Sequence, residues 1–130
     1  MKQKRSSVLD DEENKVVQLF SGLGMPKNLA KTLVYISEVE ECRTKDIEQG
    51  ADLRQPEVSV ATKELSKRGW VTKRNFKKKG KGRPVYIYRS KKPLSEILKN
   101  FEKEKLKEVE GIRKDLSTLK NIIVRGKVGA

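Results

Sequence analysis

The apolar residues between Leu94 and Ile123 recur at intervals of three and four, the spacing that is typical of a coiled coil. They are Leu94, Leu98, Phe101, Val109, Ile112, Leu116, Leu119 and Ile123. The interval of eleven between Leu98 and Val109 is a heptad plus four residues, which locally unwinds a supercoil. A helix of about thirty residues is roughly 45 Å long, more than a small domain needs. We therefore expect one globular unit at residues 7–92 and a long dimerisation helix at 93–124, between flexible tails at 1–6 and 125–130.

The composition favours a partner subunit and argues against an enzyme. Hydrophobic residues make up 35% of the 130 residues and aromatic residues 5%, which is little material for a core. There is no histidine, and the single cysteine, Cys42, excludes an intrachain disulfide and fits a reducing cytoplasm. No apolar run is long enough for a membrane span or a signal peptide. The sequence thus predicts a cytoplasmic homodimer with no catalytic residues, no metal site and no cofactor.

Positive charge is concentrated in one segment. The formal net charge is +13, and no Asp or Glu occurs between Leu65 and Ser95. That segment contains twelve cationic residues, namely Lys67, Arg68, Lys73, Arg74, Lys77, Lys78, Lys79, Lys81, Arg83, Arg89, Lys91 and Lys92. Such a balance favours an acidic polymer such as DNA or RNA as the partner, or an anionic surface.

Two helices are expected in the first forty residues. Ser7, with Asp10 three residues later, resembles a capping box that opens the first helix. Its apolar stripe is expected to contain Leu9, Val16, Phe20 and Leu23, up to a break at Gly22 and Gly24. Pro26 suits the first turn of a second helix, which should end near Cys42 and bury Leu29, Leu33 and Ile36.

A short helix, a tight turn and a longer helix are expected next. Thr44 is a good N-cap for the segment "TKDIEQGADL", in which Gly50 suggests close packing or a loose turn. After a turn at residues 52–55, Pro56 should start a helix that buries Val58, Ala61 and Leu65. Its opposite face is small, basic and partly apolar, which is unusual for a solvated face; it carries Pro56, Ser59, Val60, Lys63 and Lys67.

Two β-type runs complete the globular unit. "WVTKRNF" and "PVYIY" are separated by "KKKGKGR", which predicts a β-hairpin with a loop of about seven residues. The predicted fold is therefore mainly α-helical with a small β-hairpin. The order helix, helix, short helix, turn, helix, hairpin is that of a winged helix-turn-helix, here followed by a long C-terminal helix.

The segment "TKDIEQGADLRQPEVSVATKELSKRGWV" followed by "GKGRPVYIY" resembles the winged-helix domains of archaeal transcriptional regulators of the TrmB and MarR type. The resemblance covers about residues 19–89 and implies a dimeric DNA-binding regulator. By position, it implies base-reading contacts from the helix and phosphate or minor-groove contacts from the hairpin tip, the wing. The helix contacts are Arg54, Gln55, Pro56, Glu57, Ser59, Val60 and Lys63, and the wing contacts are Lys77, Lys78, Lys79, Lys81 and Arg83. A small-molecule effector and its site cannot be inferred from this resemblance.

The side chains themselves suit these roles. A Gln55 amide can bond an adenine edge in two places, and Lys63 or Arg54 can reach guanine or phosphate. Val60 and the Pro56 ring can pack on a thymine methyl, and Thr44 can add a phosphate contact to its expected cap. Two other hypotheses stay open at this point: a non-specific DNA-coating or RNA-binding protein, and a winged-helix module that binds another protein.

Overall fold

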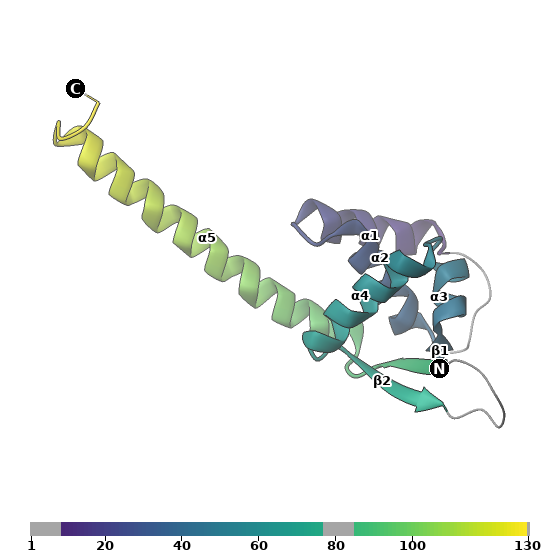
Figure 1. Ribbon diagram of the computed structural model, residues 1–130. Helices are drawn as coiled ribbons and strands as arrows, with labels where there is room; N and C mark the ends of the chain where they lie inside the picture. The colour runs from purple at the N-terminus through teal and green to yellow at the C-terminus, as the bar shows by residue number, and fades with distance from the viewer. Residues whose placement is uncertain (1–8, 77–84, 130) are drawn as a thin grey trace. The chain divides into compact units, whose positions relative to one another are not determined.

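The computed structural model describes residues 9–76 and 85–129. Five helices and three short strands follow one another along these residues. They are α1 (Asp11–Gly22), α2 (Lys27–Glu38), β1 (Cys42–Arg43), α3 (Thr44–Gly50), α4 (Gln55–Lys67), β2 (Val71–Phe76), β3 (Val85–Ser90) and α5 (Leu94–Val124). The chain divides into two compact units, Met1–Leu94 and Ser95–Ala130. The protein is thus mainly helical with a small antiparallel sheet (Figure 1).

Helix α1 begins later than the sequence indicated. Its N-cap is Asp10, whose side chain accepts from the Glu13 N–H at 2.8 Å, while the Glu13 carboxylate accepts from the Asp10 N–H at 2.8 Å. The prediction of Ser7 as the cap was therefore wrong, because the Asp10 and Glu13 pair forms the capping box three residues further on. Val17 is buried in the stripe and Leu23, after the helix, is exposed, which corrects the predicted stripe.

Helix α2 lies at the centre of the first unit. It contacts α1, α3, α4 and β3, and eight of its twelve residues are buried. The predicted core positions Leu29, Leu33 and Ile36 are all among them. The helix ends at Glu38, not near Cys42, because Val39 is extended and Cys42 enters strand β1.

The short strand β1 converts the predicted hairpin into a three-stranded sheet. The strand order is β1, β3, β2, with every neighbour antiparallel. Cys42 pairs with Tyr88, and across the hairpin Val71 pairs with Ser90 and Phe76 with Val85. Two residues of strand are too few to leave a period-two pattern in the sequence, so only the hairpin could be predicted.

Helix α3 packs closely on α2 through a glycine. A Cβ at Gly50 would overlap the ring of Tyr35, which is itself fully buried. Close packing therefore explains this glycine. Thr44 is the first residue of α3 and not its N-cap: Arg43 occupies that position, and its N–H donates to Asp46 at 2.9 Å.

Helix α4 buries the stripe that the sequence predicted, Val58, Ala61 and Leu65. It begins at Gln55, one residue before Pro56. At its other end Gly69 adopts φ 77°, and the Trp70 N–H donates to Leu65 O at 3.1 Å, so the helix ends at a glycine in the left-handed conformation. This turn directs the chain from α4 into β2.

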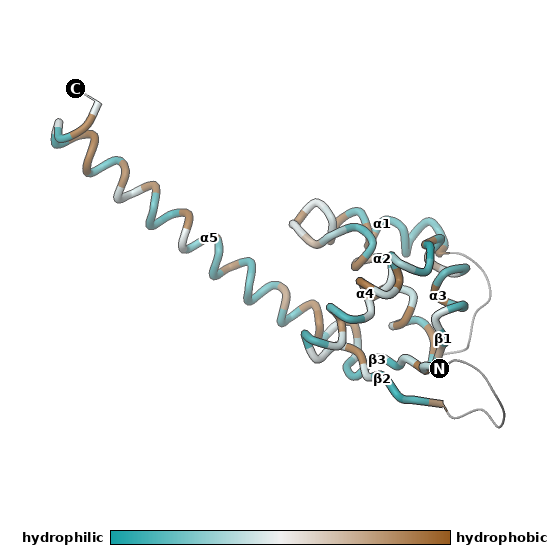
Figure 2. Tube along the Cα trace, viewed as in Figure 1, coloured by the Kyte–Doolittle hydropathy of each residue, from teal (hydrophilic) through white to brown (hydrophobic). Residues whose placement is uncertain are grey.

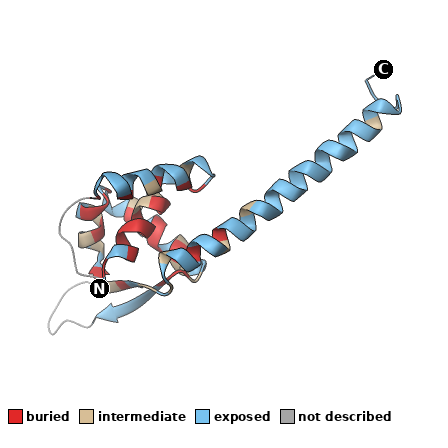
Figure 3. Ribbon diagram, turned by 180° about the vertical axis from the view of Figure 1, so that it is seen from behind, coloured by how far each residue is buried: buried red, intermediate tan, exposed pale blue. Residues whose placement is uncertain are grey.

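Helix α5 is a continuous helix of 31 residues, with no interruption at Gly111. Its buried residues are Ile97 and Phe101, and most of the rest of its surface is exposed (Figure 3). Among the described residues no helix combines the length and the apolar character needed to cross a membrane.

Candidate nucleic-acid interface

The outward face of α4 is exposed along the whole helix. Gln55, Ser59 and Lys63 follow one another at intervals of four, so they form one row on this face. Val60 is 72% exposed, and Arg54 and Pro56 are exposed at the start of the helix. The side chains that the sequence singled out on this helix therefore point away from the core, with Glu57 half-buried at the edge.

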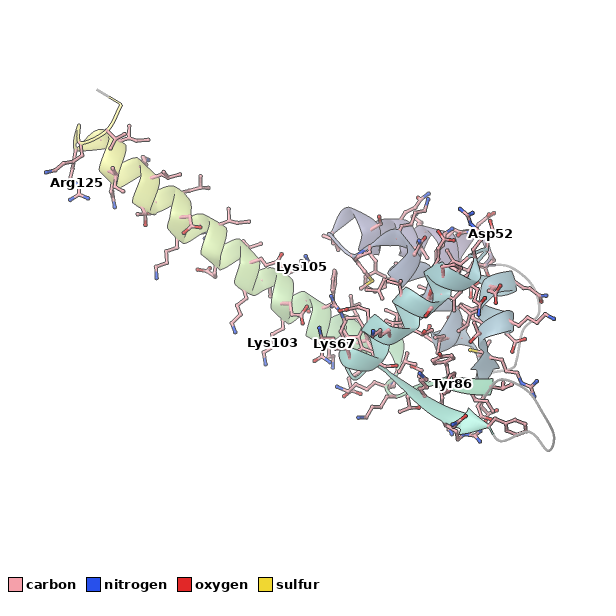
Figure 4. The ribbon with its side chains drawn as sticks, viewed as in Figure 1. Asp52, Lys67, Tyr86, Lys103, Lys105 and Arg125 are labelled. Carbon is pink, nitrogen blue, oxygen red and sulfur yellow. The ribbon has the colours of Figure 1, made fainter. Side chains whose placement is uncertain are left out.

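The row lines a groove that also includes α3 and the hairpin, which we call the hairpin groove. The α4 side contributes Gln55, Ser59 and Lys63, and the strands contribute Lys73, Tyr86 and Tyr88. Lys73 pairs with Tyr88 in the sheet, and its Nζ lies 3.9 Å from the centroid of the Tyr86 ring. Figure 4 shows Tyr86 on the hairpin beside the helices. The groove thus has a helix as one wall and an aromatic strand as the other.

The charge of the hairpin groove is mainly positive. Arg43 and Lys45 at the start of α3 line it together with Lys63 and Lys73, whereas Glu48 is its single acidic lining residue among those described. Thr44 lies between the first two and also lines the groove, although it does not cap the helix. Four cations against one acid make this concave surface suitable for a polyanion.

A second groove, the Val60 groove, lies on the other side of α4. Pro56, Glu57 and Val60 line it with Pro26 and Leu29 at the start of α2. Lys63 lines both grooves, so it lies on the ridge between them. The predicted helix contacts are thereby divided: Gln55, Ser59 and Lys63 share the hairpin groove, while Pro56 and Val60 lie on the other side.

Glu57 is held in place by neighbouring groups of the protein. Its carboxylate accepts from the Arg54 N–H at 2.9 Å and from Asn28 Nδ2 at 3.2 Å, which ties the start of α4 to α2. The hydrogen bond from the Arg54 backbone, followed by that from Asn28 and the charges of Arg54 and Lys31, lowers the pKa of Glu57 below its usual value. A carboxylate bound in this way stabilises the helix terminus.

The predicted wing contacts Lys77, Lys78, Lys79, Lys81 and Arg83 lie outside the described residues. The strands on either side of them are described, and they end at Phe76 and resume at Val85. The predicted pairing of these two strands is confirmed, from Val71 with Ser90 to Phe76 with Val85.

Among the side chains of the hairpin groove that sequence reasoning did not assign to the site are Arg43, Lys45, Lys73 and Tyr86. A signal existed for two of them. Lys73 belongs to the acid-free segment, and Tyr86 shares its strand face with the buried Tyr88 because alternate residues of a strand point the same way. Arg43 and Lys45 come close to these residues only through the pairing of β1 with β3, which the sequence did not reveal.

On α5 the predicted dimerisation residues are of three kinds. Leu98, Val109, Ile112, Leu116, Leu119 and Ile123 are exposed, Leu94 is half-buried, and Phe101 is buried. Figure 2 shows apolar positions recurring between polar ones along the helix. Phe101 therefore does not belong to the exposed row.

Comparison of the chain with protein-family models and with curated proteins finds no match. Among the described residues no cluster of three or more Cys, Asp or Glu side chains is arranged to hold a metal ion.

Proposed function

We propose that the protein is a sequence-specific DNA-binding transcription regulator that acts as a homodimer. In this proposal α3, the turn at residues 51–54 and α4 form a helix-turn-helix, and the β2–β3 hairpin is the wing of a winged helix-turn-helix. The observation that carries the proposal is the hairpin groove, in which the exposed row of α4 lies beside a basic hairpin. The four cations that line this groove favour a polyanion as the partner.

Helix α4 is the proposed recognition helix. A helix with its side chains is about 10–12 Å across, and the major groove of DNA is about 12 Å wide. Gln55 at the start of α4 would read an adenine edge, and Lys63 would reach guanine or phosphate. Ser59, between them, is small enough for close approach. Pro56 and Val60 would contact thymine methyl groups from the other side of the helix.

The remaining cations would bind the DNA backbone. Arg43, Lys45 and Lys73 surround the row of α4 and suit phosphate contacts, as Thr44 does through its hydroxyl. The wing residues at 77–83 would add contacts to phosphates or to the minor groove. Phosphate contacts supply affinity that depends on salt and carries no sequence information. The proposal thus assigns affinity to these residues and discrimination to α4.

The homodimer is proposed on the exposed apolar residues of α5. Two identical recognition helices would contact half-sites about one DNA turn apart, or a multiple of that, on a pseudo-palindromic operator.

The proposal is tested by selecting bound duplexes from a random pool and measuring binding to selected and random duplexes at several salt concentrations. Gln55→Ala is expected to weaken binding to the selected duplex only, whereas Lys79→Ala should weaken binding to both and lower the salt slope by about one. Gln18→Ala on the exposed surface of α1 is the matched control and should change neither. Equal losses on both duplexes for Gln55→Ala would contradict base reading.

A non-specific DNA-coating or RNA-binding function is the second candidate. The twelve cations between Leu65 and Ser95 favour it, because charge alone supports such binding. The ratio of selected to random affinity separates the two functions: a ratio near one supports coating. The absence of binding to mixed genomic DNA at low salt would instead favour a protein-binding module.

A further inference from the structure

The C-terminal half of α5 carries a continuous exposed apolar row. The row consists of Val109, Ile112, Leu116, Leu119 and Ile123, whose exposed fractions range from 47 to 61%. Their spacing of three, four, three and four places them in one stripe that drifts slowly around the helix. An isolated helix gains nothing by exposing such a stripe to water, because burying each of these side chains is favourable.

The two edges of the row carry opposite charges. In a heptad frame with Val109 and Leu116 at the first core position, Glu108 and Asp115 precede those residues and lie along one edge. Arg113 and Lys120 follow the other core residues, Ile112 and Leu119, and lie along the opposite edge. The row is therefore bordered by an acidic edge and a basic edge, and this asymmetry gives it a direction.

We propose that a second copy of the chain covers the row and that the two α5 helices run parallel. In a parallel pair the acidic edge of one helix meets the basic edge of the other, so that Glu108 faces Arg113 of the second copy and Asp115 faces Lys120. The two-fold symmetry makes each of these pairs twice. In an antiparallel pair each edge meets its own kind, acid against acid and base against base. The inference rests on the proposed homodimer and specifies its direction.

The seam of this pair begins at Val109. In the same heptad frame the two core positions before Val109 are occupied by Lys105 and Glu102. In a parallel pair each of them would face the identical charged residue of the second copy. Lys105 is instead engaged within its own helix, where its Nζ lies 3.0 Å from Glu108 Oε2 and 5.3 Å from the centroid of the Phe101 ring. The two helices should therefore diverge before Val109. Because the first unit directly precedes α5 in the chain, both DNA-binding units would be attached at the diverging end.

Disulfide cross-linking of the full chain tests the direction. In a Cys42→Ser background, Val109→Cys and Ile123→Cys are made as separate variants and equilibrated in a glutathione redox buffer without DNA. Parallel helices bring each residue beside its own copy, so both variants are expected to form covalent dimers. No antiparallel register can link both, because the two positions are fourteen residues apart, about 21 Å of helix, and a disulfide needs Cα atoms within about 7 Å.

Two results would overturn the proposal. One is a chain that sediments as a monomer in the cross-linking concentration range, and the other is a dimer in which one of the two variants fails to cross-link. Neither result depends on DNA. A parallel dimer that binds no DNA would support this inference and contradict the proposed function. A chain that binds the selected duplex but fails the cross-linking test would contradict this inference and leave the proposed DNA binding intact.

Charge exchange gives an independent test with its own control. Asp115→Lys and Lys120→Glu should each weaken the dimer about tenfold, since each turns two attractive pairs into repulsive ones. The double variant restores the pairs with exchanged signs and should return to the wild-type dissociation constant in sedimentation equilibrium. If the helices were antiparallel, neither single substitution would weaken the dimer, because each edge would then face its own kind.

Discussion

Helices α2 and α5 have different means of covering their apolar residues. In α2 eight of twelve residues are buried by neighbouring elements of the same unit, whereas α5 has 31 residues and two of them are buried (Figure 3). Both helices have apolar residues at helical spacing. Helix α2 is thus covered by its own chain, while the distal row of α5 would gain the same burial only from the second copy that we propose.

The largest difference between the two regions is expected for deletions of apolar side chains. Leu33→Ala in α2 should lower the free energy of unfolding by about 3 kcal/mol, because it removes a fully buried side chain and leaves a cavity. Leu116→Ala in α5 should leave the unfolding of the first unit unchanged in dilute solution, since Leu116 is 61% exposed. Denaturant unfolding at two protein concentrations measures both. An equal loss of unfolding free energy for the two variants would contradict this difference between α2 and α5.

A glycine substitution sharpens the same contrast. Gly50→Ala should destabilise the first unit by about 1–3 kcal/mol, because the new Cβ overlaps the ring of Tyr35. Gly111→Ala in α5 should be neutral or stabilising, since a Cβ there has no neighbour within 4 Å and alanine has the higher helix propensity. Thermal unfolding of the two variants compares them. If Gly50→Ala raised the melting temperature, the close packing of α3 on α2 would be disproved.

The two regions should also differ in their use of lysine. Lys73→Ala in the hairpin groove is expected to lower the salt slope of DNA binding by about one, as the loss of one phosphate contact does. Lys103→Ala, on the exposed surface of α5, should leave the slope unchanged (Figure 4). Fluorescence anisotropy at several salt concentrations measures both slopes. An effect at Lys103 equal to that at Lys73 would indicate charge attraction without a defined site.

The smallest effect concerns acid stability and is confined to the first unit. The folded protein lowers the pKa of Glu57, mainly through the Arg54 N–H, so the ionised form stabilises the fold. This contribution is complete above the ordinary pKa of about 4.5 and is lost as the pH falls toward the lowered value.

Glu57→Gln should therefore reduce the decline of stability below about pH 4.5, as followed by denaturant titration at several pH values. Asn28→Ala removes the second donor and should reduce that decline by a smaller amount. A pH profile of Glu57→Gln identical to that of the wild type would show that this carboxylate does not contribute.

Local signals in the sequence were sufficient for most of the helical framework. The proline at the start of α4 and the stripe of Val58, Ala61 and Leu65 could each be recognised from a few neighbouring residues. For Gly50 the sequence left close packing and a loose turn open, and the overlap of its Cβ position with Tyr35 decides for close packing. What could not be predicted was strand β1, because it is two residues long and exists only through pairing with β3, more than forty residues away.

The candidate site was predictable to a lesser degree. Helical spacing was enough to place Ser59, Val60 and Lys63 on the exposed face of α4, whereas Gln55 was expected there from the family resemblance. The spacing did not show that Pro56 and Val60 border a different groove, because that depends on where α2 packs. Arg43 and Lys45 were missed for the same reason: their position beside α4 is a consequence of tertiary structure.

Nuclear magnetic resonance of the ¹⁵N-labelled protein, titrated with a duplex selected from a random pool, tests the proposed interface most directly. Amide shifts are expected at Gln55, Ser59 and Lys63 of α4 and at Arg43 and Lys73 around them, with the distal part of α5 unaffected. Shifts confined to α1 or α5, or a groove whose signals do not move while the duplex binds, would contradict it.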